Sequence, residues 1–220
     1  MNREATPYLA ELLGTFGFVF VGGSSVVVNN ATNGSLGIVG IALAHGLALM
    51  AFIYAFSHVS GAHLNPAVTL SFWITKKIEN SVAAGYVIAQ LAGAILAGIF
   101  IEGIFGNARA AIPTVALSNP ITAVLLEGVL TFLLVLVVFG VLVDRRSQTK
   151  HAGIAIGLVY TGLAIVGFSL TGGLLNPARA FGPAVVANYW ANHLIFWLGP
   201  LIGATFATLV YQLGILRSKI

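Results

Sequence analysis

The chain contains no cysteine among its 220 residues, so it can form no disulfide and offers no thiolate for catalysis or metal binding. Charge is scarce as well: 7% of the residues are charged, where a soluble domain carries about 25%. Hydrophobic residues make up 58% of the chain, and the mean hydropathy is +0.98. So few charged groups cannot cover a surface that faces water. The composition therefore excludes a soluble globular protein and predicts an integral membrane protein.

The basic residues are few and unevenly placed. The ten are Arg3, Lys76, Lys77, Arg109, Arg145, Arg146, Lys150, Arg179, Arg217 and Lys219. If the N-terminus and every second connection lie inside, eight of these ten are cytoplasmic, while Arg109 lies outside and Arg179 lies within the membrane. This asymmetry follows the positive-inside rule and predicts a multi-pass protein of the cell membrane with both termini in the cytoplasm. The net charge of +4 therefore reports topology and does not indicate a nucleic-acid partner.

Six apolar segments are long enough to cross a bilayer, which takes about 20 residues of α-helix. They cover residues 8–28, 37–57, 82–103, 121–143, 152–171 and 193–215. The first is too long for the apolar part of a signal peptide, so we interpret it as a span. The segments predict an all-α membrane protein with six transmembrane helices.

One tripeptide occurs twice: Asn65-Pro66-Ala67 and Asn176-Pro177-Ala178. Asparagine is among the best residues to cap the N-terminus of a helix, and proline at the first helical position already has a helical φ. Only about ten apolar residues follow each box, half of what a span needs. The boxes therefore predict two short half-helices that dip into the membrane from its two sides and meet at the centre.

The two halves of the chain repeat. Asn65 and Asn176 stand 111 residues apart, and the same offset aligns Gly46 with Gly157. Each half holds two spans, a half-helix and a third span. Because three crossings is an odd number, the second half must be inverted relative to the first. We therefore expect a single transmembrane domain over residues 1–220, with inverted repeats of about 1–105 and 115–220.

Facing half-helices would create a site that repels cations. The positive ends of two helix dipoles and two asparagine NH₂ donors would meet at the narrow centre. The Gly- and Ser-rich residues before each box would offer backbone carbonyls to a polar path, since irregular backbone at membrane depth must be buried or line a cavity. The pattern predicts a pore with a cation barrier.

Two longer segments carry a family resemblance. Ser60-Gly-Ala-His-Leu-Asn-Pro-Ala-Val-Thr69 and Thr171-Gly-Gly-Leu-Leu-Asn-Pro-Ala-Arg-Ala-Phe-Gly-Pro183 resemble the two signature loops of the aquaporin, or major intrinsic protein, family. The resemblance covers essentially the whole chain. It implies an aquaporin-like fold, one pore per subunit, a homotetramer in the lipid membrane, and passive conduction of water. It also implies that the chain is not an enzyme and has no cofactor.

The resemblance further implies which residues select the solute. By the family's spacing from the two boxes, the filter positions are His45, Ala164, Gly173 and Arg179. This set differs from the strictly water-selective pattern and is similar to the wider, histidine-containing filters of plant tonoplast-type members. We therefore expect a water channel whose filter is wide enough for small neutral solutes and closed to protons and ions. The alternative is a glycerol or ammonia facilitator of the same family.

Three further polar residues are candidates for supporting the loops. Glu11 and Glu127 are buried carboxyl groups at equivalent places, and we interpret them as acceptors for backbone N–H groups of the re-entrant segments. A proton relay in an ion-coupled transporter is the alternative reading of this pair. His63, two residues before Asn65, either contacts the path or braces the loop. The sequence contains no metal-ligand cluster and no nucleophile–base constellation; a closed, structural membrane protein is the remaining alternative.

Overall fold

The computed structural model describes residues 5–147 and 150–215, and within these ranges the elements are all helices. The long helices are α1 (Thr6–Ala31), α2 (Gly37–Ser60), α4 (Asn80–Phe105), α5 (Pro120–Val138), α6 (Ala152–Gly167) and α8 (Ile195–Val210). The short helices are α3 (Pro66–Ile74) and α7 (Pro177–Val186). The turns are the 3₁₀ turn η1 (Ala108–Ala111) and two π-helical turns that prolong α5 and α8, η2 (Phe139–Val143) and η3 (Tyr211–Ile215). Three residues of the topology prediction, Arg3, Arg217 and Lys219, lie outside the described residues.

Six helices stand where six spans were predicted. Five of them, with α5 and α8 counted together with their π-helical turns, are long and apolar enough to cross a membrane. The remaining helix, α6, has 16 residues and ends at Gly167, four residues before the predicted end of that span. It ends there because the chain turns: the N–H groups of Thr171 and Gly172 both donate to the Gly167 carbonyl, at 2.9 and 3.2 Å. The sequence prediction overran because Phe168 and Leu170 continue the apolar run into this turn.

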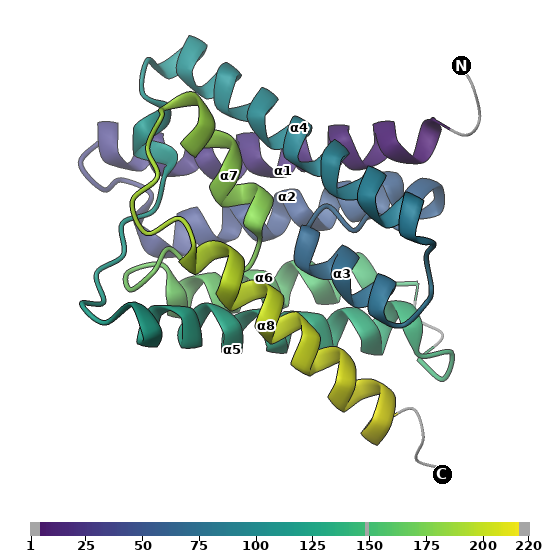
Figure 1. The fold of residues 1–220 in the computed structure, drawn as a ribbon. Helices are drawn as coiled ribbons and strands as arrows, with labels where there is room; N and C mark the ends of the chain where they lie inside the picture. The colour runs from purple at the N-terminus through teal and green to yellow at the C-terminus, as the bar shows by residue number, and fades with distance from the viewer. Residues whose placement is uncertain (1–4, 148–149, 216–220) are drawn as a thin grey trace.

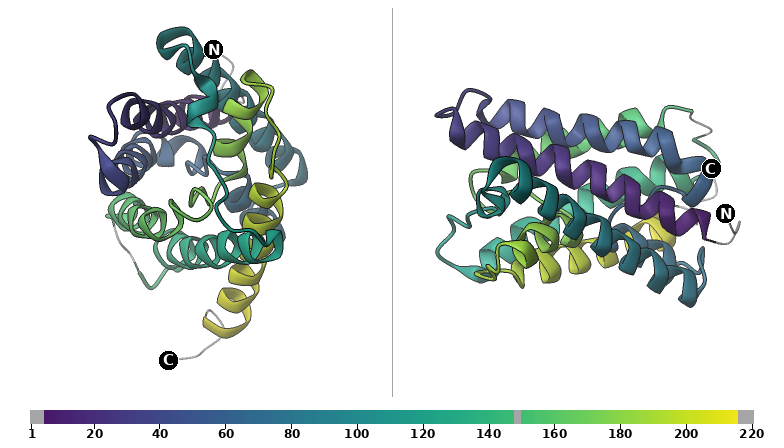
Figure 2. Two further views of the ribbon diagram at one scale, coloured as in Figure 1. Left: turned by 90° about the vertical axis from the view of Figure 1, so that its left-hand side faces the viewer. Right: turned by 90° about the horizontal axis from the view of Figure 1, so that it is seen from above.

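The two short helices lie between α4 and α8 on the face of the bundle that is nearest the viewer in Figure 1, and Figure 2 shows the bundle from two further sides. Helix α1 packs against α2 and α4, α5 packs against α8, and α2 packs against α6. The short helices lie in opposite halves of the bundle, with α3 against α4 and α8 and α7 against α4. Helix α1 begins and η3 ends at the same end of the bundle, which we call the terminal end; η1 lies at the opposite end.

Helices α2 and α6 cross closely at a pair of glycines. A Cβ atom on Gly157 would lie 2.6 Å from the carbonyl oxygen of Gly46, and one on Gly46 would collide with the Gly157 carbonyl. Only glycine permits this approach, as is usual where transmembrane helices pack through their backbones. The two glycines that the 111-residue offset aligns are therefore in contact with each other. The crossing holds α6 against α2 and so positions the side chains described below.

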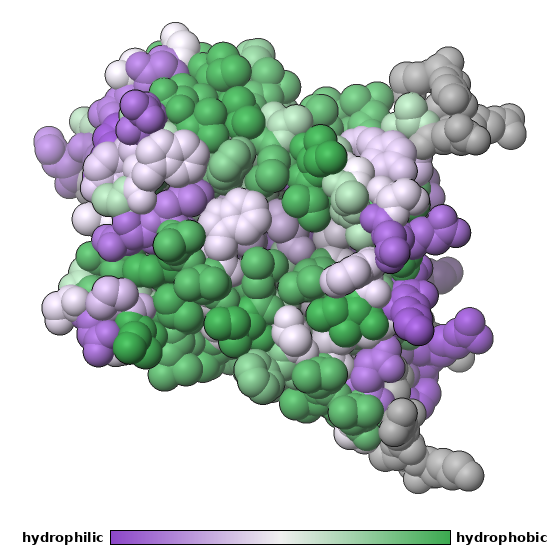
Figure 3. Space-filling view, in the orientation of Figure 1, coloured by the Kyte–Doolittle hydropathy of each residue, from purple (hydrophilic) through white to green (hydrophobic). Residues whose placement is uncertain are grey.

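The outer surface has an apolar middle and hydrophilic ends. Green, hydrophobic residues cover the centre of the face in Figure 3, and purple residues gather at its two ends. Large apolar side chains such as Ile88, Ile121 and Leu125 are exposed on the outside of the bundle. Exposed Lys76 and Lys77 lie in the connection between α3 and α4 at the terminal end. This distribution fits a bundle surrounded by lipid, with its ends in water.

Candidate functional site

The two Asn-Pro boxes begin the two short helices, as the sequence predicts. The side chain of Asn65 caps α3 by accepting a hydrogen bond from the N–H of Ala67 at 2.9 Å. Asn176 caps α7 in the same way, accepting from the N–H of Ala178 at 3.0 Å. Pro66 and Pro177 occupy the first helical position, where the missing N–H costs nothing. Ala67 and Ala178 are fully buried in the main hydrophobic cluster, which fixes the two helix ends in the centre of the bundle.

Each asparagine also binds the other half of the molecule. The Nδ2 atom of Asn65 donates to the Leu175 carbonyl at 2.8 Å, and that of Asn176 donates to the Leu64 carbonyl at 2.9 Å. The two bonds are reciprocal, and they join the re-entrant segments directly before their helices begin. An asparagine amide has two N–H groups, so one on each side chain is still available to a passing molecule.

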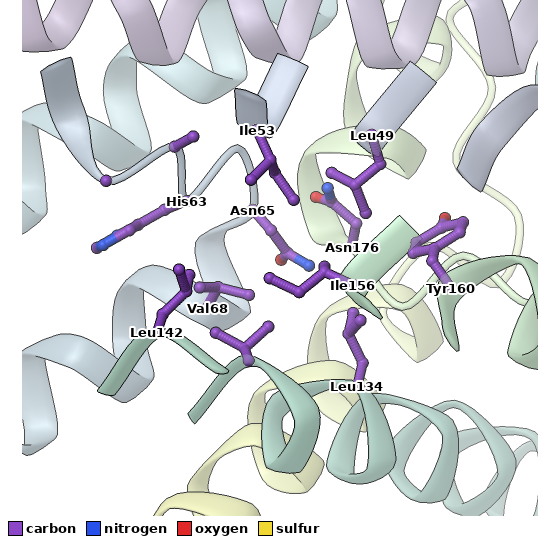
Figure 4. Close-up of a pocket in the computed structure, with 13 residues that line it drawn as sticks. Leu49, Ile53, His63, Asn65, Val68, Leu134, Leu142, Ile156, Tyr160 and Asn176 are labelled. Atoms are coloured by element: carbon purple, nitrogen blue, oxygen red, sulfur yellow. The ribbon is translucent and has the colours of Figure 1, made fainter. Parts of the chain in front are cut away.

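A narrow cavity lies beside the asparagine pair, and both asparagines line it (Figure 4). Its walls are mainly apolar, with Leu49, Ile53, Val68, Leu134, Val138, Leu142 and Ile156. The polar groups facing it are the two asparagines, His63 and Tyr160, with His63 at one end and Tyr160 at the other. The volume of the cavity is about 20 Å³. Since one buried water needs roughly 10–15 Å³, the cavity has room for about one or two waters at a time.

Glu11 supports the first re-entrant segment. Its carboxyl oxygens accept hydrogen bonds from the backbone N–H groups of His63 and Leu64, at 2.8 and 2.7 Å. They also accept from the Ser60 hydroxyl at 2.7 Å and from the Gln90 amide at 2.8 Å. Buried backbone donors without a partner are costly, and this carboxyl group satisfies two of them where no helix can.

Glu127 supports the second re-entrant segment with matching bonds. It accepts from the backbone N–H groups of Leu174 and Leu175, at 3.2 and 2.9 Å, and from the Thr171 hydroxyl at 2.6 Å. Each of these donors stands 111 residues after its counterpart on the Glu11 side. Both glutamates are fully buried and point at backbone, so their placement is that of loop supports.

His63 combines the two roles that the sequence left open. Its Nδ1 atom is hydrogen-bonded to the Thr69 hydroxyl at 3.2 Å, and its ring packs against Phe72 and Tyr86. The same side chain lines the cavity at its terminal end. The histidine therefore ties the first re-entrant segment to α3 while its ring forms part of the wall.

The predicted filter residues His45 and Arg179 lie in direct contact. The Nδ1–H group of His45 donates to the Ile41 carbonyl at 2.8 Å, because a carbonyl can only accept. In a neutral imidazole this leaves Nε2 as an acceptor, and Nε of Arg179 donates to it at 3.1 Å. A second guanidinium nitrogen of Arg179 donates to the Ala111 carbonyl in η1 at 3.0 Å. The arginine is 1% exposed, so the site buries a positive charge among acceptors.

The other two predicted filter residues carry no polar side chain, and neither lines the cavity past the asparagines. Ala164 lies on α6 and is 3% exposed. Gly173 lies in the second re-entrant segment with φ +54°, a conformation that favours glycine, and packs against the backbone of Gly167. The four positions thus come from α2, α6, the re-entrant segment and α7.

Tyr160 lines the path and was missed by the sequence reasoning. It is 1% exposed, its ring stacks on His45 with centroids 6.1 Å apart, and it packs edge-on against Phe18 at 5.4 Å. Its hydroxyl donates to the Leu174 carbonyl at 2.7 Å. The one signal available was its position four residues before Ala164, which places both side chains on the same face of α6.

Comparisons with known proteins agree with this arrangement. A family model described as Major intrinsic protein matches residues 3–211. Aquaporin TIP4-4 of Zea mays is 42% identical over 213 residues, which cover 93% of this chain and 84% of the relative. Aquaporin AqpM of Methanothermobacter thermautotrophicus is 36% identical over 233 residues, covering 93% and 95%. The solved structure of the aquaglyceroporin from Plasmodium falciparum matches with a TM-score of 0.84 and 25% identity over 97% of each chain.

Proposed function

The chain belongs to the major intrinsic protein family, and we propose that it is a passive membrane channel that conducts water and small neutral solutes. Members of this family are channels rather than enzymes. The observation that carries the proposal is the narrow cavity past Asn65 and Asn176, whose side chains each keep one N–H group for a passing molecule. About one or two waters fit this cavity at a time, and a bulky substrate does not.

The same geometry supports the exclusion of protons and cations. The N-termini of α3 and α7 meet at the asparagine pair, so the positive ends of two helix dipoles face the centre of the path. Arg179 adds a full positive charge beside His45. Helix dipoles and an arginine lining a pore form an electrostatic barrier to cations, whereas neutral molecules cross it.

The identity of the filter is part of the proposal. We assign His45, Ala164, Gly173 and Arg179 to it, with Glu11 and Glu127 as supports of the loops. A second candidate, a glycerol or ammonia facilitator, is favoured by the small side chains of Ala164 and Gly173. In either case residues 1–220 form one channel domain made of the two repeats, 1–105 and 115–220.

We further propose that the terminal end of the bundle faces the cytoplasm of a cell membrane. Lys76, Lys77, Arg145 and Arg146 lie in the connections at that end, and Arg109 lies in η1 at the opposite end, so the positive-inside rule supports this orientation. The exposed apolar sides of the bundle leave room for neighbouring subunits, and a homotetramer with one pore per subunit fits the family.

Reconstituted vesicles test the proposed function. Proteoliposomes that contain the protein should shrink faster than empty ones under an osmotic step, with a low activation energy and without a proton leak. The same vesicles in glycerol and in methylammonium solutions rank the solutes. Water flux no faster than that of empty liposomes would refute both channel functions and favour a structural protein. Transport that requires an ion gradient would favour an ion-coupled transporter.

A further inference from the structure

Tyr160 occupies a point in the wall between the asparagine pair and the filter. It lines the cavity together with Asn65 and Asn176, and Figure 4 shows it at the end of the cavity beyond Asn176. On its other side, the ring of Tyr160 stacks on the ring of His45 at an interplanar angle of 13°. Because His45 in turn accepts from Arg179, Tyr160 lies between the asparagine pair and the two polar residues of the proposed filter.

The tyrosine ring is held at both ends. Its backbone belongs to α6, which the close glycine crossing fixes against α2. Its hydroxyl donates to the Leu174 carbonyl in the second re-entrant segment at 2.7 Å. Phe18 of α1 packs edge-on against it at 5.4 Å and closes the third side. A buried ring that is anchored by its hydroxyl and packed on its faces has no room to turn aside for a larger solute.

The two filter residues with the smallest side chains do not widen the path at the Tyr160 ring. Ala164 stands one helical turn after Tyr160 on α6, and Gly173 directly precedes Leu174, whose carbonyl binds the tyrosine hydroxyl. Neither residue lines the cavity at the ring, and a side chain on Gly173 would meet the Gly167 backbone, so their small size does not widen the path at Tyr160. In a path of serial constrictions the narrowest one decides which solutes pass.

We propose that Tyr160 sets the size limit of this channel. The ring restricts passage to water and neutral molecules of similar width, such as ammonia, and it excludes glycerol and urea although Ala164 and Gly173 carry small side chains. This inference rests on the proposed channel function and specifies the class of solute that the channel conducts. At the corresponding position of the first half stands Leu49, so the second half alone carries this ring.

Solute fluxes through Tyr160 variants test the inference. Wild-type proteoliposomes should conduct water quickly and glycerol and urea no faster than empty vesicles. Tyr160→Val should raise the glycerol and urea permeabilities at least about tenfold while water flux stays at or above the wild-type level. Tyr160→Phe keeps the ring and loses only the bond to Leu174, so glycerol should stay excluded. Tyr54→Val is the control, because Tyr54 of α2 packs against Gly153 of α6 and does not line the cavity.

The outcomes separate this inference from the proposed function. Wild-type vesicles that conduct no water refute the channel itself. Wild-type vesicles that conduct water and glycerol alike refute only the size limit, and this result needs no variant. A Tyr160→Val protein that conducts water and still excludes glycerol and urea also refutes it, as does an equal gain in Tyr54→Val. If the valine variant does not fold, Tyr160→Leu, which fills more of the ring's volume, takes its place with the same expectation.

Discussion

Replacing Glu11 distinguishes a loop support from a proton relay. In Glu11→Ala the backbone N–H groups of His63 and Leu64 lose their acceptor. The Ser60 hydroxyl also loses its acceptor and keeps only the bond that it accepts from the N–H of Ala62, whereas the Gln90 amide keeps its bond to Thr69. Leaving a buried donor unsatisfied costs about 1–3 kcal/mol. The two backbone donors alone therefore predict a loss of about 2–6 kcal/mol in the free energy of unfolding.

Glu11→Gln refines the prediction. Glutamine keeps one acceptor oxygen and puts an NH₂ group in place of the other, so only one of the two backbone N–H groups retains its partner. We expect about half the loss of the alanine variant, about 1–3 kcal/mol. Glu79→Ala is the control: Glu79 is exposed before α4 and caps no helix with its side chain, so its loss should change stability by less than about 0.5 kcal/mol.

Two assays on the same preparations check both parts. Thermal unfolding in detergent should rank Glu79→Ala with the wild type, then Glu11→Gln, then Glu11→Ala. Water flux in proteoliposomes should persist in Glu11→Gln, because an amide still supports the loop although it cannot carry a proton. An unchanged melting temperature in Glu11→Ala would refute the supporting role. Loss of all transport in a folded Glu11→Gln protein would instead favour the proton relay.

Three further predictions concern packing, charge and pH. Gly46→Ala should lower the free energy of unfolding by roughly 1–3 kcal/mol in a melting assay, because the added Cβ forces α2 away from α6. Gly162→Ala, where the Cβ would meet open space, should leave stability unchanged. Equal effects of the two variants would contradict the close crossing. Arg179→Val should raise the methylammonium leak, and unchanged leak would remove the arginine from the filter. A hydrogen bond from Arg146 holds the pKa of the Asp144 carboxyl below its usual range. The stability that ionised Asp144 contributes is therefore complete above the ordinary carboxyl pKa and is lost on acidification. The melting temperature of Asp144→Asn should lie below that of the wild type at neutral pH, and the two should converge in acid.

The features that the sequence predicted well depend on local patterns. Run length and hydropathy indicate the six spans, and Asn-Pro indicates both short helices because cap and first turn are local chemistry. The end of α6 at Gly167 was predicted wrongly, since Phe168 and Leu170 continue the apolar run into the turn that follows the helix. The π-helical turns η2 and η3 after α5 and α8 were likewise not predicted, because their sequences continue the apolar runs.

The parts of the site that were missed depend on contacts between distant segments. The family resemblance implied His45 and Arg179 as filter residues, but it did not predict their hydrogen bond, which joins residues 134 positions apart. Tyr160 gave no signal of its own, since an aromatic residue on an apolar helix usually packs in a core. Its role rests on the Leu174 carbonyl and on the His45 ring, which meet it only after α6 has packed against α2.

The two halves of the molecule repeat in their scaffold and differ in the residues at the positions of the proposed filter. At the offset of 111 residues, Ile156 corresponds to His45 and Val68 to Arg179, and both apolar counterparts line the cavity near the asparagine pair. A buried arginine is costly in the membrane unless acceptors surround it. The second half meets this condition at Arg179, because η1 supplies the Ala111 carbonyl and α2 supplies the histidine. Val68, at the matching position of the first half, lines the cavity beside the asparagine pair and carries no charge, so the arginine of the proposed filter comes from one half of the repeat.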